Sequence, residues 1–177
     1  MVYVMLADGF EEVEAIEPID ILKRGGVEVT TVGVKGKTVT GAHGIIVTAD
    51  IEISEVNPEN MELLMLPGGA GHEILDASNE VHGLINYAVV NGLYISAICA
   101  SPSILGKKMM LEGKKATCFP GFEKYLYGAE VVSDKAVIDG KIITGKGAGA
   151  ASEFGFAMLE ILKDKETADK IKEIMQY

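Results

Sequence analysis

The segment ISAICASP, residues 95–102, decides the fold, because it reads as a buried strand that runs directly into a helix. The apolar run ends at Cys99, and Pro102 stands where a helix can begin, since proline is tolerated in a first turn. Small residues flank the cysteine, as in the sharp nucleophile elbow between a strand and a helix. Such a turn exposes the side chain at the carboxyl edge of a parallel sheet, where α/β proteins bind ligands. It also brings the sulfur to a helix N-terminus, which favours the reactive thiolate.

Cys99 alone is equally consistent with a buried, inert core residue, because free cysteine is often buried. A catalytic interpretation needs a partner, and Glu14 is the candidate. It lies in an acidic segment whose other members (Glu11, Glu12 and Glu17) complement the helix dipole. The loop after the first strand and the turn after a central strand open at the same sheet edge, so the two side chains can meet. A carboxyl buried beside a thiolate keeps its proton, because burial and a like charge both raise its pKa.

Strand-like and helix-like segments alternate on both sides of this turn. We expect strands at residues 2–6, 27–32, 63–66, 93–98 and 141–144, with shorter ones near 39, 45–47 and 51–53. We expect helices at residues 13–24, 81–90, 153–162 and 167–175, and one beginning at 102, the first with an apolar stripe of Val13, Ile16, Ile19 and Leu22. The alternation predicts an α/β fold with a mostly parallel central sheet and helices on both faces. Residues 1–177 are expected to form a single domain, since no linker or repeat interrupts them.

Composition narrows the class of partner. The formal net charge of −10 argues against nucleic acid and anionic membranes, which need basic patches. Residues 83–106 carry no formal charge, but polar residues, glycine and proline interrupt them, so we expect no membrane span. No basic segment precedes the first apolar run, so no signal peptide is expected. Two cysteines without metal-ligand spacing predict neither a disulfide framework nor a metal site, and favour a reducing, cytoplasmic compartment.

Two glycine-rich turns lie near the ends of expected strands. Gly68 and Gly69 follow Pro67 at the same sheet edge as Cys99, where backbone N–H groups can approach a ligand. With the N–H of Ala100 they could form an oxyanion hole, although a plain strand-to-helix turn explains them equally well. The glycine-rich turn at residues 145–149 has neither a Rossmann fingerprint nor a Walker A lysine motif, so we expect no nucleotide cofactor.

The remaining candidates carry weaker signals. His72 lies just past the glycine loop and could approach the site, but we expect it, like His43 and His82, to be a surface or turn histidine rather than a catalytic base. Cys118 is expected to be structural, and the alternative is a resolving partner for Cys99.

These features together resemble the DJ-1/ThiJ/PfpI superfamily, and its DJ-1 and YajL-like branch in particular. The resemblance covers nearly the whole chain and rests on six motifs in order. They are GFEEVE at 9–14, PID at 18–20, KRGGV at 23–27, LPGG at 66–69, AICA at 97–100 and TGKGAG at 144–149.

The resemblance implies a flavodoxin-like three-layer sandwich and a homodimer. It implies that Cys99 is the nucleophilic, oxidation-sensitive cysteine, that Glu14 is its protonated partner, and that the amides of Gly69 and Ala100 are oxyanion donors. The activities that the resemblance implies are cofactor-free conversion of methylglyoxal to lactate, repair of early glycation adducts, redox-dependent chaperoning and peroxide sensing.

The sequence departs from the family pattern at three positions. Cys99 is followed by Ala100 rather than the histidine of protease-like members, which disfavours a Cys–His peptidase. Phe119 stands where some relatives have a histidine, which leaves more of the proton transfer to Glu14. His43 stands where some relatives have an arginine, so substrate preference can differ.

The leading hypothesis is a cofactor-free, glyoxalase III-like or deglycase enzyme for methylglyoxal-type 2-oxoaldehydes or early glycation adducts. Its partner would be a small aldehyde, attacked by Cys99 while Glu14 moves protons. The rival hypothesis is a redox sensor or redox-regulated chaperone that uses oxidation of the same cysteine.

Overall fold

A seven-stranded sheet forms the centre of the structure, a computed structural model that describes residues 1–177. The strand order is β10-β11-β7-β6-β1-β2-β5, and every neighbouring pair is parallel except β10 and β11. The strands are β1 Val2–Leu6, β2 Val29–Gly33, β5 Ile51–Glu52, β6 Leu63–Leu66, β7 Tyr94–Ile98, β10 Ala136–Asp139 and β11 Ile142–Gly145. Because β1, β6 and β7 lie side by side at the centre, the loops that follow them meet at one sheet edge.

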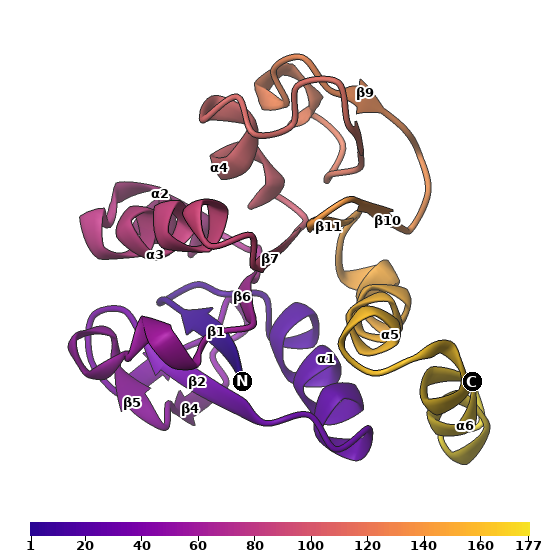
Figure 1. The fold of residues 1–177 in the computed structure, drawn as a ribbon. Coiled ribbons are helices and arrows are strands. Elements are labelled where there is room, and N and C mark those ends of the chain that lie inside the picture. The colour runs from indigo at the N-terminus through magenta and orange to yellow at the C-terminus, as the bar shows by residue number, and fades with distance from the viewer.

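Helices cover both faces of the sheet, as Figure 1 shows. One face carries α1 Glu12–Arg24, α5 Ala151–Leu162 and α6 Lys165–Ile174, and the other carries α2 His72–Ala77, α3 Asn79–Val90 and α4 Pro102–Lys107. Each face has its own hydrophobic core, one of 22 buried residues and one of 21, so the sheet is sandwiched between two cores. The predicted flavodoxin-like α/β fold is confirmed.

Smaller elements complete the chain. A hairpin joins β3 Thr38–Thr40 to β4 Ile46–Thr48, and β8 Lys115–Ala116 pairs with β9 Glu130–Val131. The short 3₁₀ turns are η1 Ile53–Glu55, η2 Pro58–Asn60, η3 Glu123–Tyr125 and η4 Ala148–Ala150. The sequence analysis missed α2, β8, β9 and β10, because such short segments carry little periodicity and depend on tertiary pairing.

The predicted apolar stripe of the first helix is partly wrong. Val13 and Ile16 are each 44% exposed, whereas Ile19 and Leu22 are buried as expected. The buried face of α1 is therefore rotated from the predicted stripe: at the start of the helix it holds Glu14 and Ala15 in place of Val13 and Ile16. The rotation arises because α1 packs chiefly against α5. The second strand also begins two residues later than expected, at Val29 rather than at residue 27.

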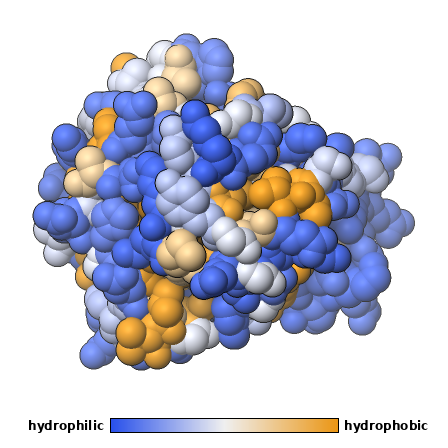
Figure 2. Space-filling model, turned by 90° about the horizontal axis from the view of Figure 1, so that it is seen from above, coloured by the Kyte–Doolittle hydropathy of each residue, from blue (hydrophilic) through white to orange (hydrophobic).

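The hydropathy of the surface varies from place to place (Figure 2). Viewed from above, the molecule is mostly hydrophilic, with a few separate hydrophobic patches (Figure 2). None of the helices combines the length and the apolar character that crossing a bilayer requires.

Candidate active site

Cys99 lies in a sharp turn between β7 and α4. Its φ of 66° is in the left-handed region, which costs a non-glycine residue energy and is held only by surrounding contacts. Two backbone hydrogen bonds provide such contacts: the N–H of Cys99 donates to the carbonyl of Gly145 at 2.9 Å, and the N–H of Phe119 donates to the carbonyl of Cys99 at 2.8 Å. The predicted elbow geometry is therefore present, and the thiol that it carries is half-buried.

Ser101 joins the elbow to the glycine loop that follows β6. Its buried hydroxyl donates a 2.6 Å hydrogen bond to the carbonyl of Pro67. This bond fixes the position of Gly68 and Gly69 relative to Cys99. The sequence analysis read Ser101 only as a small residue, because nothing in its neighbours marks a contact 34 residues away.

Glu14 projects from α1 into the same place. Its side chain is 1% exposed, its Oε2 accepts the Gly68 N–H at 3.0 Å, and its Oε1 has no hydrogen-bond partner. A Cβ at Gly68 would lie 2.5 Å from both the Cys99 Cβ and the Glu14 Oε2. The missing side chain of Gly68 therefore gives the carboxyl and the thiol room to approach, and they lie within hydrogen-bonding reach of each other.

Electrostatics couple the two groups. Burial raises the pKa of Glu14 to about 7, although hydrogen bonds from Cys99 and from the Gly68 amide oppose the shift. Burial, and then the negative charge of Glu14, raise the pKa of Cys99 to about 12. Because the first proton leaves near pH 7 and the second only at strongly alkaline pH, the pair shares one proton and one negative charge over the range between.

This result corrects the expectation of a thiolate stabilised by the helix N-terminus. The helix that begins at Pro102 has six residues, and the pKa of Cys99 rises instead of falling. The sequence argument counted the helix dipole but not the burial of the sulfur or the charge of Glu14. A thiolate at Cys99 therefore requires that its proton be held by Glu14.

Two backbone amides converge on the sulfur, those of Gly69 and Ala100, and both lower the pKa of Cys99. Gly69 has a φ of 78°, and a Cβ there would lie 2.4 Å from the carbonyl oxygen of Gly9. Only glycine fits this approach, so the loop can bring its N–H to the site. Donors placed in this way can stabilise an oxyanion formed beside the sulfur.

The other predicted residues lie at different distances from this centre. Phe119 is 47% exposed, and its ring lies next to Gly147, which faces Glu14. His72 contacts the site indirectly, through a 2.9 Å hydrogen bond from its Nδ1 to the carbonyl of Gly69.

Cys118 is buried in the core on the opposite side of the sheet from the core that Cys99 contacts. Burial and Glu123 raise the pKa of Cys118 to about 11. Both observations favour the structural interpretation over a resolving role.

Glu12 is a buried charge that the sequence analysis did not single out. Its carboxylate accepts the His43 N–H at 2.7 Å and the Ile45 N–H at 3.4 Å, and it pairs with the His43 Nδ1 at 2.9 Å. Burial opposes its ionisation, but these hydrogen bonds outweigh burial and lower its pKa to about 2. Glu11, Glu12 and His43 each offer one atom that could ligate a metal ion, and these three atoms lie within 4.8 Å of one another. Because both Glu12 oxygens are already satisfied, the cluster is better explained as the anchor of the β3–β4 hairpin.

Comparison with known proteins agrees with the fold and the motifs. The sequence model of the DJ-1/PfpI family matches residues 1–161. DJ-1 homolog B of Arabidopsis thaliana is 38% identical over 96% of this chain, which spans only 40% of that longer protein. A deglycase of Pyrococcus abyssi is 31% identical, and the match covers 92% of this chain and 99% of the relative. The structure of oxidized Toxoplasma gondii DJ-1 has a TM-score of 0.94 at 34% identity, with 99% of this chain and 97% of that one covered. The chain belongs to the DJ-1/PfpI family.

Proposed function

We propose that this protein is a cysteine-dependent, cofactor-free enzyme that acts on methylglyoxal-type 2-oxoaldehydes or on early glycation adducts. The observation that carries the proposal is the pairing of Cys99 with the buried carboxyl of Glu14, with the Gly69 and Ala100 amides directed at the sulfur. The resemblance to a Pyrococcus abyssi protein described as a deglycase supports the same class of chemistry.

The first step is addition of the thiol to the aldehyde. The Cys99 sulfur forms a bond to the aldehyde carbon while its proton passes to the Glu14 carboxylate. The carbonyl oxygen becomes an oxyanion, which the Gly69 and Ala100 amides stabilise until Glu14 gives it the proton taken from Cys99, and this leaves Glu14 as a carboxylate again. The product is a hemithioacetal on Cys99.

The second step moves a proton along the substrate. The Glu14 carboxylate removes the hydrogen from the former aldehyde carbon, which gives an enediol, and a proton is returned to the neighbouring carbon. The first carbon is oxidised to a thioester and the second is reduced to an alcohol, so no external oxidant or cofactor is needed. Water then hydrolyses the thioester, which releases a 2-hydroxy acid and the free thiol.

The test is turnover of methylglyoxal by the wild-type protein and the variants Cys99→Ser and Glu14→Gln. Loss of the nucleophile or of the proton carrier should each lower kcat by at least about 100-fold. Cys118→Ser is the matched control, because it removes the other thiol and should keep the wild-type rate. Equal rates in the wild type and the first two variants would remove the proposal.

A second candidate function is peroxide sensing or redox-regulated chaperoning through Cys99. The half-buried position of its sulfur favours it, as does a related Toxoplasma gondii structure that is described as oxidized. Peroxide titration with intact mass measurement separates the two. A two-oxygen gain confined to Cys99, with altered client aggregation and no aldehyde turnover, would support the sensor and contradict the enzyme.

We also propose that the chain forms a homodimer. The support comes from apolar side chains on the surface of α1 and the neighbouring hairpin. Val13 and Ile16 are each 44% exposed, and Ile45 and Ile46 are 57% and 65% exposed. The hydrogen bonds from His43 and Ile45 to Glu12 hold the hairpin against the start of α1, so these side chains belong to one region. Covering that region with a second copy would bury apolar surface.

A further inference from the structure

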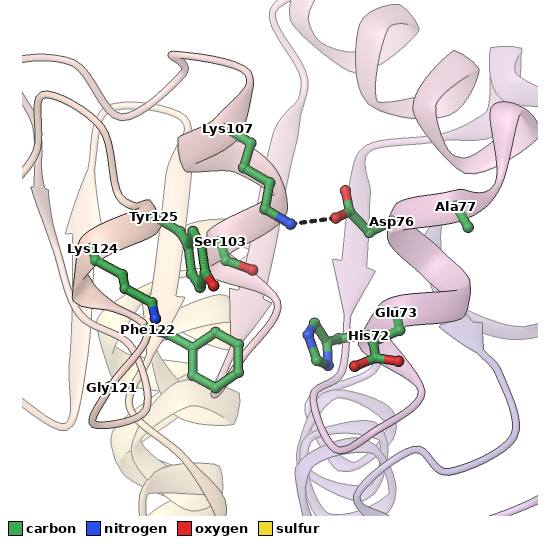
Figure 3. Close-up of a pocket in the computed structure, with 10 residues that line it drawn as sticks. All are labelled: His72, Glu73, Asp76, Ala77, Ser103, Lys107, Gly121, Phe122, Lys124 and Tyr125. Carbon is green, nitrogen blue, oxygen red and sulfur yellow. Dashed lines mark hydrogen bonds and ion pairs between the residues drawn. The ribbon is translucent and has the colours of Figure 1, made fainter.

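A cavity of about 490 Å³ lies between α2 and the segment formed by α4 and η3. Figure 3 shows its two walls. One wall carries His72, Glu73 and Asp76, and the other carries Ser103, Lys107, Phe122, Lys124 and Tyr125. Neither Cys99 nor Glu14 lines it, so it is distinct from the site described above. The two share one link, because His72 lines the cavity and its Nδ1 binds the carbonyl of Gly69.

Ser103 is the first indication that the cavity binds a ligand. The residue is 1% exposed, and its hydroxyl has no hydrogen-bond partner within the protein. Its oxygen is directed into the space between the walls (Figure 3). A buried hydroxyl without a partner is unfavourable, so this position calls for an acceptor supplied from outside the chain.

The charges on the two walls indicate what kind of ligand fits. Lys107 is already paired with Asp76 at 2.6 Å and closes one end of the cavity. Lys124 on η3 and Glu73 on α2 form no ion pair, and they face the cavity from opposite walls (Figure 3). The unpaired charges are thus one cation beside the Ser103 wall and one anion across the cavity.

Aromatic rings from both walls also line the cavity. Phe122 meets the edge of His72 with ring centroids 5.3 Å apart, and Tyr125 lies 6.0 Å from Phe122. The ammonium groups of Lys107 and Lys124 lie 5.2 and 5.0 Å from the centre of the Tyr125 ring. The His72 Nδ1 donates to the Gly69 carbonyl, so Nε2 is the ring nitrogen that makes no hydrogen bond within the protein.

We propose that this cavity binds a free α-amino acid in its zwitterionic form, with an aromatic side chain. The carboxylate accepts hydrogen bonds from the Ser103 hydroxyl and the Lys124 ammonium group. The α-ammonium group pairs with Glu73, and the side chain packs on Phe122. A simple anion fits less well, because Glu73 and Asp76 would repel it, and a simple cation would leave Ser103 without an acceptor.

The experiment is a titration of the ¹⁵N-labelled wild-type protein with L-phenylalanine, followed by amide chemical shifts. Saturable shifts are expected at residues 72–77 and 121–125, with a Kd of about 1 mM. N-acetyl-L-phenylalanine lacks the ammonium charge and L-phenylalaninamide lacks the carboxylate. Each should bind at least about tenfold more weakly, since each leaves a charged group of the cavity unpaired.

Variants test the residues individually. Ser103→Ala, Lys124→Met and Glu73→Gln should each weaken L-phenylalanine binding by about three- to tenfold. The exposed pair Lys170→Met and Glu166→Gln on α6 makes the same charge changes on the other face and should leave the Kd unchanged. Since Lys124 and Glu73 are exposed, their variants should fold even if Ser103→Ala does not.

Three outcomes would overturn the proposal. The first is the absence of saturable shifts up to about 20 mM, which would mean that water alone satisfies Ser103. The second is equal binding of the two single-charge analogues. The third is loss of binding in Cys99→Ser, which would assign the ligand to the other site. The result does not depend on aldehyde turnover, so this proposal and the proposed enzyme can fail separately.

Discussion

At the scale of single residues, the proposed chemistry depends on one proton shared between Cys99 and Glu14. The carboxyl is buried and receives only one hydrogen bond from the protein backbone, from the Gly68 amide. Its pKa of about 7 makes it able both to accept and to return a proton near neutral pH, which a general acid–base catalyst needs. Phe119, whose ring lies next to Gly147 beside Glu14, supplies no alternative base.

The first prediction concerns the pH dependence of turnover. The nucleophile is activated only after the pair has lost its first proton, so kcat/KM should rise as the pH passes through about 7. The measurement is methylglyoxal turnover between about pH 5 and pH 9. Glu14→Gln should abolish the inflection along with most of the activity. A profile that is flat across this range in the wild type would contradict the assignment.

The second prediction concerns stability. Folding raises the pKa of Glu14 from 4.5 to about 7, so the folded state holds the proton more tightly and loses stability as the pH rises through that window. At pH values above the window, Glu14→Gln should increase the free energy of unfolding by about 1–3 kcal/mol. Below about pH 4.5 the difference should vanish. Urea unfolding at both pH values checks this, and a variant that is less stable than the wild type at high pH would show that the buried charge of Glu14 does not destabilise the fold.

At the scale of elements, the loops after β1, β6 and β7 hold one another in place. The N–H of Glu11 donates to the carbonyl of Gly68 at 3.1 Å, and the N–H of Gly71 donates to that of Gly9 at 2.9 Å. The β3–β4 hairpin also contacts these loops, because the N–H of Gly9 donates to the carbonyl of Thr40 at 2.8 Å. The position of the Gly69 amide therefore depends on several elements at once.

The third prediction tests the anchor of the hairpin. Glu12→Gln keeps the shape of the side chain but removes its charge, and it should lower the free energy of unfolding by about 1 kcal/mol at pH 7. Folding lowers the pKa of Glu12 to about 2, so the stabilisation is present above pH 4.5 and is lost as the pH falls through the window below it. Thermal unfolding at several pH values measures the effect, with the exposed Glu28→Gln as control. A difference that does not shrink in acid would mean that the Glu12 charge is not responsible.

At the scale of the whole molecule, a sheet with a hydrophobic core on each face supports the loops at its carboxyl edge. Apolar surface is left over on α1 and the hairpin, where Val13, Ile16, Ile45 and Ile46 are exposed. This surface lies next to the Glu12 anchor and close to the segment that carries Glu14. A second copy bound there would exclude water from that side of the site.

The fourth prediction follows from that surface. Ile16→Asp together with Ile46→Asp should convert a dimer into a monomer, because both charges would be buried in the interface. Analytical ultracentrifugation measures the mass, and Val90→Asp with Ile138→Asp changes two exposed apolar residues elsewhere as a control. A wild-type protein that sediments as a monomer at high concentration would contradict the dimer.

The sequence by itself determined the layers and the location of the site. Periodicity distinguished strands from helices, and Cys99, Glu14 and the Gly68–Gly69 loop could be placed at one edge because each follows a central strand. Only the tertiary structure decided which face of α1 is buried, that Glu12 is a buried anchor and that Ser103 opens onto a second cavity. It also decided that the pKa of Cys99 is raised and not lowered. Burial and long-range hydrogen bonds depend on residues that are distant in sequence. A local sequence pattern does not show which of those residues come into contact, so it could not predict these features.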